Sequence, residues 1–202
     1  MKTNIGSIVK LGLALMLFAT VACVGLAFVY SATKEDIAKN QTKAQNEALK
    51  ELFPDADESP ELKEPIESTG SAVKFGKQFE IRKGGSVVGI AITATGSSYG
   101  GKATVLVGVG SGGRIKGVKI MEISDTPGLG ANASSPTFFV GDKAKKITYY
   151  GQFAEKSVDD PFVAKGDVEA ITASTITSRS IAVIVKAAGT AGRDWLAKGG
   201  VK

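Results

Sequence analysis

Five hydroxyl side chains within positions 172–178 are the residues best suited to chemistry: Thr172, Ser174, Thr175, Thr177 and Ser178. Hydroxyl residues are typical of a helix N-terminus, where their oxygens accept hydrogen bonds from free N–H groups. The same N–H groups and the positive end of the helix dipole suit a phosphate. The pattern therefore predicts either a phosphate site or a heavily capped helix that binds nothing. Apolar residues at 3- and 4-residue spacing follow and predict one buried helix face: Ile181, Ile184, Val185, Ala188, Trp195 and Leu196.

The residues around this cluster, Glu169-Ala-Ile-Thr-Ala-Ser-Thr-Ile-Thr-Ser178, resemble the flavinylation motif of the FMN-binding domain family. In that family one threonine of the motif carries FMN through a phosphoester bond, and the resemblance assigns this role to Thr175. By the same resemblance, a separate flavin transferase would attach the cofactor. Ala173 stands where the family usually has glycine, and Ser174 where it usually has alanine. The resemblance implies that the rest of the motif also binds the cofactor: Thr172, Ala173, Ser174, Ile176, Thr177 and Ser178.

A second stretch, Ser124-Asp-Thr-Pro-Gly-Leu-Gly130, is by its residue types a Pro-Gly turn whose glycines allow a ligand to approach the backbone closely. It resembles the Glu-Thr-Pro-Gly-Leu-Gly signature of the same family, with Asp125 in place of the glutamate. The two motifs occur in the family's order, and the resemblance covers residues 75–198. It implies that this turn forms the opposing wall of the flavin pocket through four residues: Thr126, Gly128, Leu129 and Gly130.

The absence of histidine and the presence of one cysteine, Cys23, exclude several classes of site. A Ser-His-Asp or Cys-His catalytic site cannot be built, and zinc sites lack their usual ligands. Iron–sulfur clusters need several cysteines, and haem normally needs a histidine or cysteine ligand. Redox chemistry would therefore depend on an organic cofactor. The net charge of +5 comes from scattered basic residues, so nucleic-acid binding is not expected.

Four segments rich in valine, isoleucine and phenylalanine predict β-strands: 74–82, 87–95, 102–109 and 114–123. Short glycine-rich spacers separate them, so we expect hairpins and an antiparallel sheet. Residues 138–156 predict a loop with short helical turns and buried aromatic side chains. Two further segments, 158–163 and 168–171, have the composition of strands. The expected fold class is α+β, an antiparallel-sheet FMN-binding domain with flanking helices, preceded by one N-terminal transmembrane helix.

Residues 11–30 carry no charge and predict that transmembrane helix, because 20 residues at about 1.5 Å each span roughly 30 Å of hydrocarbon. A cleaved signal peptide and a lipoprotein site at Cys23 are alternatives, but the apolar run is longer than a signal peptide needs and continues beyond Cys23. Lys2 and Lys10 precede the run, while Glu35 and Asp36 follow it. The positive-inside tendency therefore predicts a cytoplasmic N-terminus and an extracytoplasmic remainder.

These features predict four parts: a cytoplasmic N-terminus at 1–10, a transmembrane helix at 11–30, a juxtamembrane helix and acidic linker at 31–67, and an extracytoplasmic FMN-binding domain at 68–202. We expect the juxtamembrane helix to stop before Pro54 because the residue preceding a proline disfavours helical backbone. Residues 54–67 are acidic and contain three prolines, which predicts an irregular surface segment.

This organisation resembles the G subunits of Rnf complexes, which couple electron flow between ferredoxin and NAD to ion translocation across the cell (inner) membrane. The resemblance implies an electron-transfer subunit with covalent FMN, whose partners are the other subunits of an Rnf-type complex. It implies no catalytic residue, no metal site and no substrate of its own. Three alternatives remain open: a component like the C subunit of sodium-translocating NADH:quinone reductases, a membrane-anchored, non-redox scaffold domain with a vestigial flavin motif, and a free-standing reductase, which would need a pocket for a diffusible donor.

Overall fold

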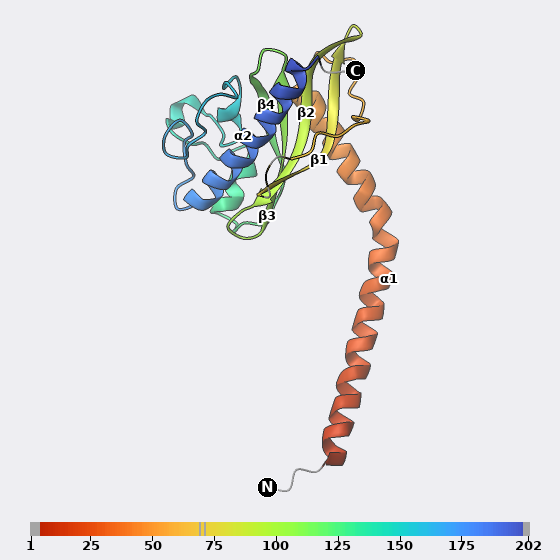
Figure 1. The fold of residues 1–202 in the computed structure, drawn as a ribbon. Helices are drawn as coiled ribbons and strands as arrows, with labels where there is room; N and C mark the ends of the chain where they lie inside the picture. Colours follow the sequence, from red (N-terminus) through yellow and green to blue (C-terminus); the bar gives the residue numbers. More distant parts are fainter. Residues whose placement is uncertain (1–4, 69, 71, 200–202) are drawn as a thin grey trace. The chain divides into compact units, whose positions relative to one another are not determined.

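A computed structural model describes residues 5–68, 70 and 72–199 (Figure 1). The chain divides into two compact units, Met1–Ala44 and Gln45–Lys202. Residues 1–4, from the predicted cytoplasmic segment, and residues 69, 71 and 200–202, from the predicted FMN-binding domain, lie outside the described residues.

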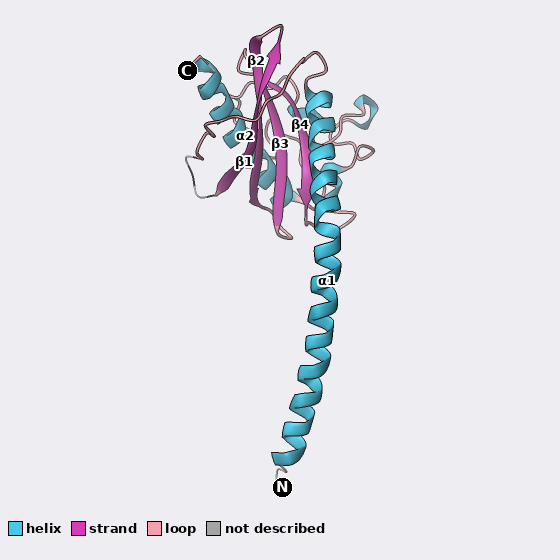
Figure 2. Cartoon of the chain, turned by 90° about the vertical axis from the view of Figure 1, so that its right-hand side faces the viewer, coloured by secondary structure: helices cyan, strands magenta, loops and turns pink. Residues whose placement is uncertain are grey.

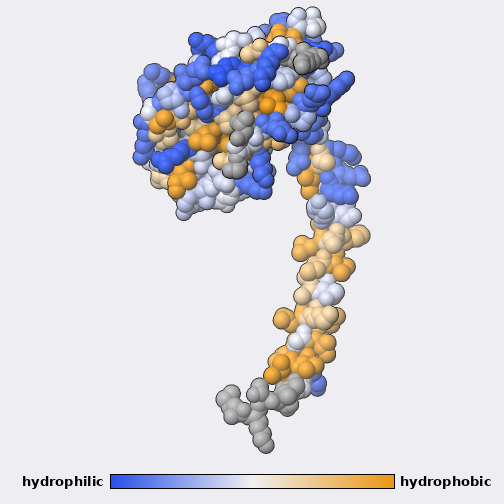
Figure 3. All heavy atoms as spheres, in the orientation of Figure 1, coloured by the Kyte–Doolittle hydropathy of each residue, from blue (hydrophilic) through white to orange (hydrophobic). Residues whose placement is uncertain are grey.

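Helix α1, Ile5–Leu52, is continuous over 48 residues, so the predicted transmembrane and juxtamembrane segments form one helix. It ends just before Phe53-Pro54, as expected from the restriction that proline places on the preceding residue. Within the first unit its apolar side chains are exposed, with 73% of Phe18 and 75% of Phe28 accessible. Figure 3 shows apolar residues covering this part of the helix. Within the described chain it is the one helix that is long and apolar enough to cross a membrane.

The second unit contains a four-stranded antiparallel sheet in the order β1-β2-β3-β4 (Figure 2). The strands are Val73–Lys83, Ser86–Ser97, Lys102–Gly110 and Ile115–Ile123, and each end lies within two residues of the prediction. Each strand pairs with the next along the chain, as the short glycine-rich spacers require. Together with the helices, this sheet confirms the α+β fold class.

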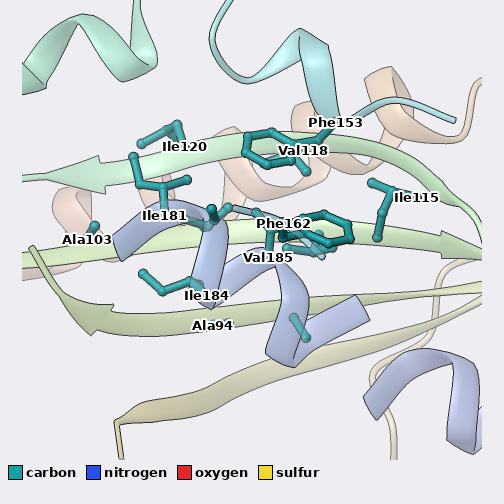
Figure 4. Close-up of a cluster of buried hydrophobic side chains, with 14 of the residues drawn as sticks. Ala94, Ala103, Ile115, Val118, Ile120, Phe153, Phe162, Ile181, Ile184 and Val185 are labelled. Carbon is teal, nitrogen blue, oxygen red and sulfur yellow. The ribbon is translucent and has the colours of Figure 1, made fainter. Parts of the chain in front are cut away.

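Helix α2, Thr175–Ala197, packs on one face of the sheet. Its predicted apolar face is confirmed, because Ile181, Ile184, Val185 and Ala188 are fully or almost fully buried. Figure 4 shows three of these side chains among residues of β2, β3 and β4, with Phe153 and Phe162 completing the cluster from the loops that follow the sheet. The first turn of α2 is therefore held against the sheet by the burial of the turns behind it.

The last turns of α1 cover the opposite face of the sheet within the second unit. Neighbouring strand residues point to opposite faces, so Ile90 packs in the α2 cluster whereas Ala91 packs against Ala48 and Leu49 of α1. The side-chain amide of Gln45 also donates to the Thr93 hydroxyl at 3.2 Å. The compact unit thus begins at Gln45, and the domain boundary predicted at 68 falls inside it.

The acidic segment 54–67 follows the free edge of β1. The Glu80 amide donates to the Pro60 carbonyl at 2.9 Å, and the Leu62 amide donates to the Gln78 carbonyl at 2.8 Å. Glu58 and Glu61 form isolated bridges with β1. The segment is irregular, as predicted, and it also satisfies backbone groups that an exposed edge strand would leave unpaired.

The prediction of strands at 158–163 and 168–171 is wrong, since both segments are loops in the structure. The Asp167 carboxylate accepts hydrogen bonds from the Phe162 and Val163 amides at 3.1 and 2.6 Å. Such side-chain bonds to backbone groups compete with strand pairing. Phe162 also has a positive φ of 56°, which interrupts extended backbone. The loop with short helical turns at 138–156 is confirmed, and Tyr149 and Phe153 within it are fully buried.

Candidate functional site

The hydroxyl cluster lies at the N-terminus of α2, as predicted, because the helix begins at Thr175. Ser174 occupies the N-cap position, and its side chain makes no capping hydrogen bond. The first N–H groups of an α-helix have no partner within the helix. The start of α2 therefore offers backbone donors and the positive end of a 23-residue helix dipole.

The Ser174 hydroxyl is the only buried side-chain polar atom without a hydrogen-bond partner in the described part of the chain. The residue is 8% exposed. Leaving a buried hydroxyl unpaired costs about 1–3 kcal/mol. An acceptor or donor from a bound group beside the helix N-terminus would remove this cost.

A cavity of about 400 Å³ adjoins the N-terminus of α2. Its size lies within the range usual for small-molecule sites. Residues from both motifs, which are far apart in the sequence, form its walls together with one residue of the β2–β3 turn: Tyr99, Thr126, Leu129, Gly130, Ala173, Ser174, Thr175, Ile176 and Thr177. Since backbone donors, an unpaired hydroxyl and apolar side chains converge there, the cavity suits a small ligand with an anionic group and an apolar part.

Tyr99 was not predicted as a site residue. Its side chain is 68% exposed at the cavity rim, near Leu129 at 42% and Ile176 at 57%. An aromatic residue in the glycine-rich turn at 96–101 was the available signal, since large exposed aromatic side chains are enriched at binding surfaces.

Three predicted site residues do not line this cavity. Gly128 has a φ of +79°, so it serves the turn that carries Thr126 and Leu129. Thr172 lines a separate cavity of about 500 Å³ with Phe138, Phe139 and Lys143. Ser178 is fully buried, where its hydroxyl accepts a hydrogen bond from the Ile171 amide and donates one to the Ser174 carbonyl.

Asp125 connects the two motifs. One oxygen of its buried carboxylate, Oδ2, accepts hydrogen bonds from the Thr177 hydroxyl at 2.5 Å and the Ser98 hydroxyl at 2.7 Å. The other oxygen, Oδ1, accepts from the Gly100 amide at 2.7 Å. Burial by itself raises the pKa of this carboxyl, but these hydrogen bonds, together with one from the Tyr99 backbone amide, outweigh burial, so the pKa of Asp125 is lowered. The carboxylate is therefore ionised and holds the β2–β3 turn, the Pro-Gly turn and α2 together.

This network decides which hydroxyls remain available. Thr177 has one hydroxyl proton, and that proton is donated to Asp125. Ser178 likewise donates its proton to the Ser174 carbonyl. Of the four hydroxyls other than Thr175 that the motif contributes, only Ser174 combines a cavity-lining position with an unused proton.

Gly130 lies where the cavity wall meets this network. A Cβ at this position would lie 2.5 Å from Thr177 Oγ1 and 2.6 Å from Asp125 Oδ2, which are distances that side chains do not tolerate. The glycine allows the Pro-Gly turn to contact the first turn of α2 directly.

Ala173 adopts left-handed backbone with a φ of +61°. This conformation is unfavourable for residues other than glycine. It reverses the chain just before the N-cap, so that Ser174 and Thr175 face the cavity. The need for left-handed backbone explains why the flavinylation motif usually has glycine here, and Ala173 carries local strain of the kind found at functional sites.

Two family models match the chain. The FMN-binding domain matches residues 98–190, which include every residue that lines the cavity. The RnfG N-terminal region matches residues 1–52, where 52 is also the last residue of α1. The G subunit of the Na⁺-translocating ferredoxin:NAD⁺ oxidoreductase complex of Acetobacterium woodii is 31% identical over 184 residues, 85% of each chain.

The chain belongs to the RnfG family. Among other relatives, the G subunit of the proton-translocating ferredoxin:NAD⁺ oxidoreductase complex of Clostridium ljungdahlii is 30% identical over 170 residues, which cover 81% of this chain and 80% of the relative. The G subunit of the ion-translocating oxidoreductase complex of Methanosarcina acetivorans is 30% identical over 178 residues, 86% and 88% of the two chains. As an RnfG family member, the chain combines a membrane-associated apolar helix with an FMN-binding domain.

Proposed function

We propose that the chain is the electron-transfer G subunit of a membrane-bound Rnf-type complex and that it carries FMN through a phosphoester bond to Thr175. The observation that supports this most directly is the unpaired Ser174 hydroxyl beside Thr175, at a helix N-terminus inside a cavity lined by both family motifs. The family relatives are subunits of ion-translocating oxidoreductase complexes, two of them named for ferredoxin and NAD⁺.

Different residues of the cavity would bind the phosphate and the ring of the cofactor. Thr175 would supply the ester oxygen, and Ser174 and the first amides of α2 would donate to the phosphate oxygens. Tyr99, Leu129 and Ile176 provide exposed apolar surface for the ring. Bound FMN supplies the capacity to take up and release electrons, which the side chains lack. An ester at the phosphate end leaves the ring free while preventing loss of the cofactor.

The printed names of the relatives support an electron carrier within a larger assembly, because each relative is a subunit of an oxidoreductase complex. The electrons would then come from, and pass to, other subunits of that complex. The match to the RnfG N-terminal region favours the Rnf assembly over a sodium-translocating quinone reductase.

Charge around α1 supports a cytoplasmic N-terminus and an extracytoplasmic FMN domain. Lys10 precedes the apolar stretch of the helix, whereas Glu35 and Asp36 follow it. Positive residues are retained on the cytoplasmic side of membrane helices. A covalent link suits a domain on the outer side, because a dissociated cofactor could not be recovered there.

The test is co-expression of the full chain with a flavin transferase, followed by intact-mass measurement and in-gel flavin fluorescence. We expect a mass increase equal to FMN minus water, with fluorescence that survives denaturation. Thr175→Ala should lose both signals. Ser180→Ala, a hydroxyl on the same helix that does not line the cavity, should retain both.

Peptide mapping of the wild-type protein identifies the modified residue. Folded wild-type protein without flavin, beside a control substrate that the same transferase modifies, would refute the carrier function and favour the scaffold alternative. Flavin that remains on Thr175→Ala would refute the assignment of the ester.

A further inference from the structure

Asp125 is a buried carboxylate without a cation. It is 5% exposed, and within the described part of the chain no ion pair includes it. Its hydrogen-bond donors are all neutral: the hydroxyls of Ser98 and Thr177 and the backbone amides of Tyr99 and Gly100. Burying an unpaired charge is costly, and the hydrogen bonds distribute this charge without cancelling it. The chain therefore maintains a net negative charge inside the domain.

The charge lies directly behind the wall of the cavity. Thr177 and Gly130 both line the cavity, and Thr177 donates to the Asp125 Oδ2 atom at 2.5 Å. A Cβ at Gly130 would be 2.6 Å from the same oxygen, so the backbone of Gly130 packs against the carboxylate. Asp125 therefore contacts two residues of the cavity wall without lining the cavity itself.

We propose that Asp125 tunes the redox equilibrium of the bound flavin and lowers its reduction potential. The inference rests on the proposed function, because it requires FMN in this cavity. Reduction adds two electrons to the ring, and negative charge accumulates wherever proton uptake is incomplete. A fixed negative charge disfavours that accumulation, and in a protein interior its effect is screened far less than in water. Asp125 thus acts on the flavin through space and exchanges no proton or electron with it.

The isosteric variant Asp125→Asn separates charge from shape. The remaining Oδ1 atom still accepts from the Gly100 amide. The new amide group faces the hydroxyls of Ser98 and Thr177, and each can rotate to accept a hydrogen bond instead of donating one. The variant therefore loses the charge while it keeps the connections between the turns and α2.

The experiment is a spectroscopic redox titration of flavin-loaded full-length protein against a reference dye, with dithionite as the electron donor and buffer as the proton donor. We expect Asp125→Asn to raise the ratio of reduced to oxidised flavin about tenfold at a given dye potential, which corresponds to about +30 mV for a two-electron couple. The readout is flavin absorbance and is independent of turnover by the complex.

Two control variants define the cause. Asp167→Asn removes another carboxylate that accepts backbone amides, but its partners Lys156, Phe162 and Val163 do not line the cavity, so the ratio should change less than about twofold. Ser98→Ala keeps the charge of Asp125 and removes one neutral donor. Because fewer neutral donors then share the charge, the ratio should move toward oxidised flavin.

The outcomes are distinct. An unchanged ratio in Asp125→Asn overturns the tuning role while the proposed function stands. If Asp125→Asn does not fold or load flavin, Ser98→Ala decides. A ratio that is unchanged or shifted toward reduced flavin overturns the charge effect, and a shift toward oxidised flavin supports it. Wild-type protein that acquires no flavin overturns both proposals.

Discussion

Substituting glycine for Ala173 should stabilise the domain, although the same substitution usually destabilises proteins. Left-handed backbone, here with a φ of +61°, costs an L-residue about 1–2 kcal/mol. The Ala173 side chain is exposed, so removing its methyl group forfeits no burial. Glycine has more conformational freedom than alanine in the unfolded chain, and this effect offsets about 0.4–1 kcal/mol of the stabilisation. The net gain should be about 0.5–1 kcal/mol, or roughly 1–4 °C in the unfolding midpoint of a domain of this size.

The single tryptophan, Trp195, packs at the edge of the core and gives a fluorescence signal for unfolding. Flavin-free full-length protein should be unfolded by heat and by urea, because bound flavin would quench the signal. Ala187→Gly is the matched control: it lies within α2, where glycine costs about 1 kcal/mol. The two substitutions should shift the midpoint in opposite directions. A loss of stability in Ala173→Gly comparable to that in Ala187→Gly would refute the claim that the backbone at 173 is strained.

Two further predictions concern the packing beside Asp125 and the ionisation of Asp125 and Asp167. Gly130→Ala should destabilise the domain by about 1–3 kcal/mol and reduce flavin loading, because the new Cβ would collide with Thr177 and Asp125. The control Gly112→Ala should do neither, since a Cβ there has nothing within 4 Å. Equal unfolding midpoints for the two variants would contradict the packing at Gly130. The pKa values of Asp125 and Asp167 are both lowered, because in each case hydrogen bonds outweigh burial, which alone would raise them. Their stabilisation should therefore be complete above the unfolded pKa of about 3.9 and be lost as the pH falls through the lower folded values. In acid titrations followed by Trp195 fluorescence, stability of the Asp125→Asn variant should depend less on pH than that of the wild-type protein. An unchanged acid transition would refute the stabilising role of the Asp125 carboxylate.

Local sequence patterns were sufficient for the secondary structure that positions the site. Glycine-rich spacers between β-branched segments predicted all four strands of the sheet, because hairpin turns depend on a few adjacent residues. The 3- and 4-residue spacing of Ile181, Ile184, Val185 and Ala188 predicted the buried face of α2 for the same reason. The position of the hydroxyl cluster at the start of that helix followed directly from where the spacing began.

Local patterns failed where hydrogen bonds with residues outside the segment determined its backbone. Residues 158–163 have the composition of a strand, yet the Asp167 carboxylate accepts hydrogen bonds from the backbone amides of Phe162 and Val163, so these amides are not available for strand pairing. The acidic segment 54–67 gave no signal for pairing with β1, because its backbone atoms rather than its side chains form the hydrogen bonds. Neither interaction leaves a periodic trace in the sequence.

The sequence by itself determined the kind of site: small hydroxyl residues before a helix, a Pro-Gly turn, and no histidine or cysteine set to support other redox chemistry. Only the tertiary structure decided how these residues divide their roles. Asp125 and Thr177 are 52 positions apart, and their contact assigns the Thr177 proton to the carboxylate, leaves Ser174 as the free hydroxyl, and sets a negative charge behind the cavity. Residue types and short spacings specify what a side chain can do, whereas its available partners depend on the chain segments that folding brings together.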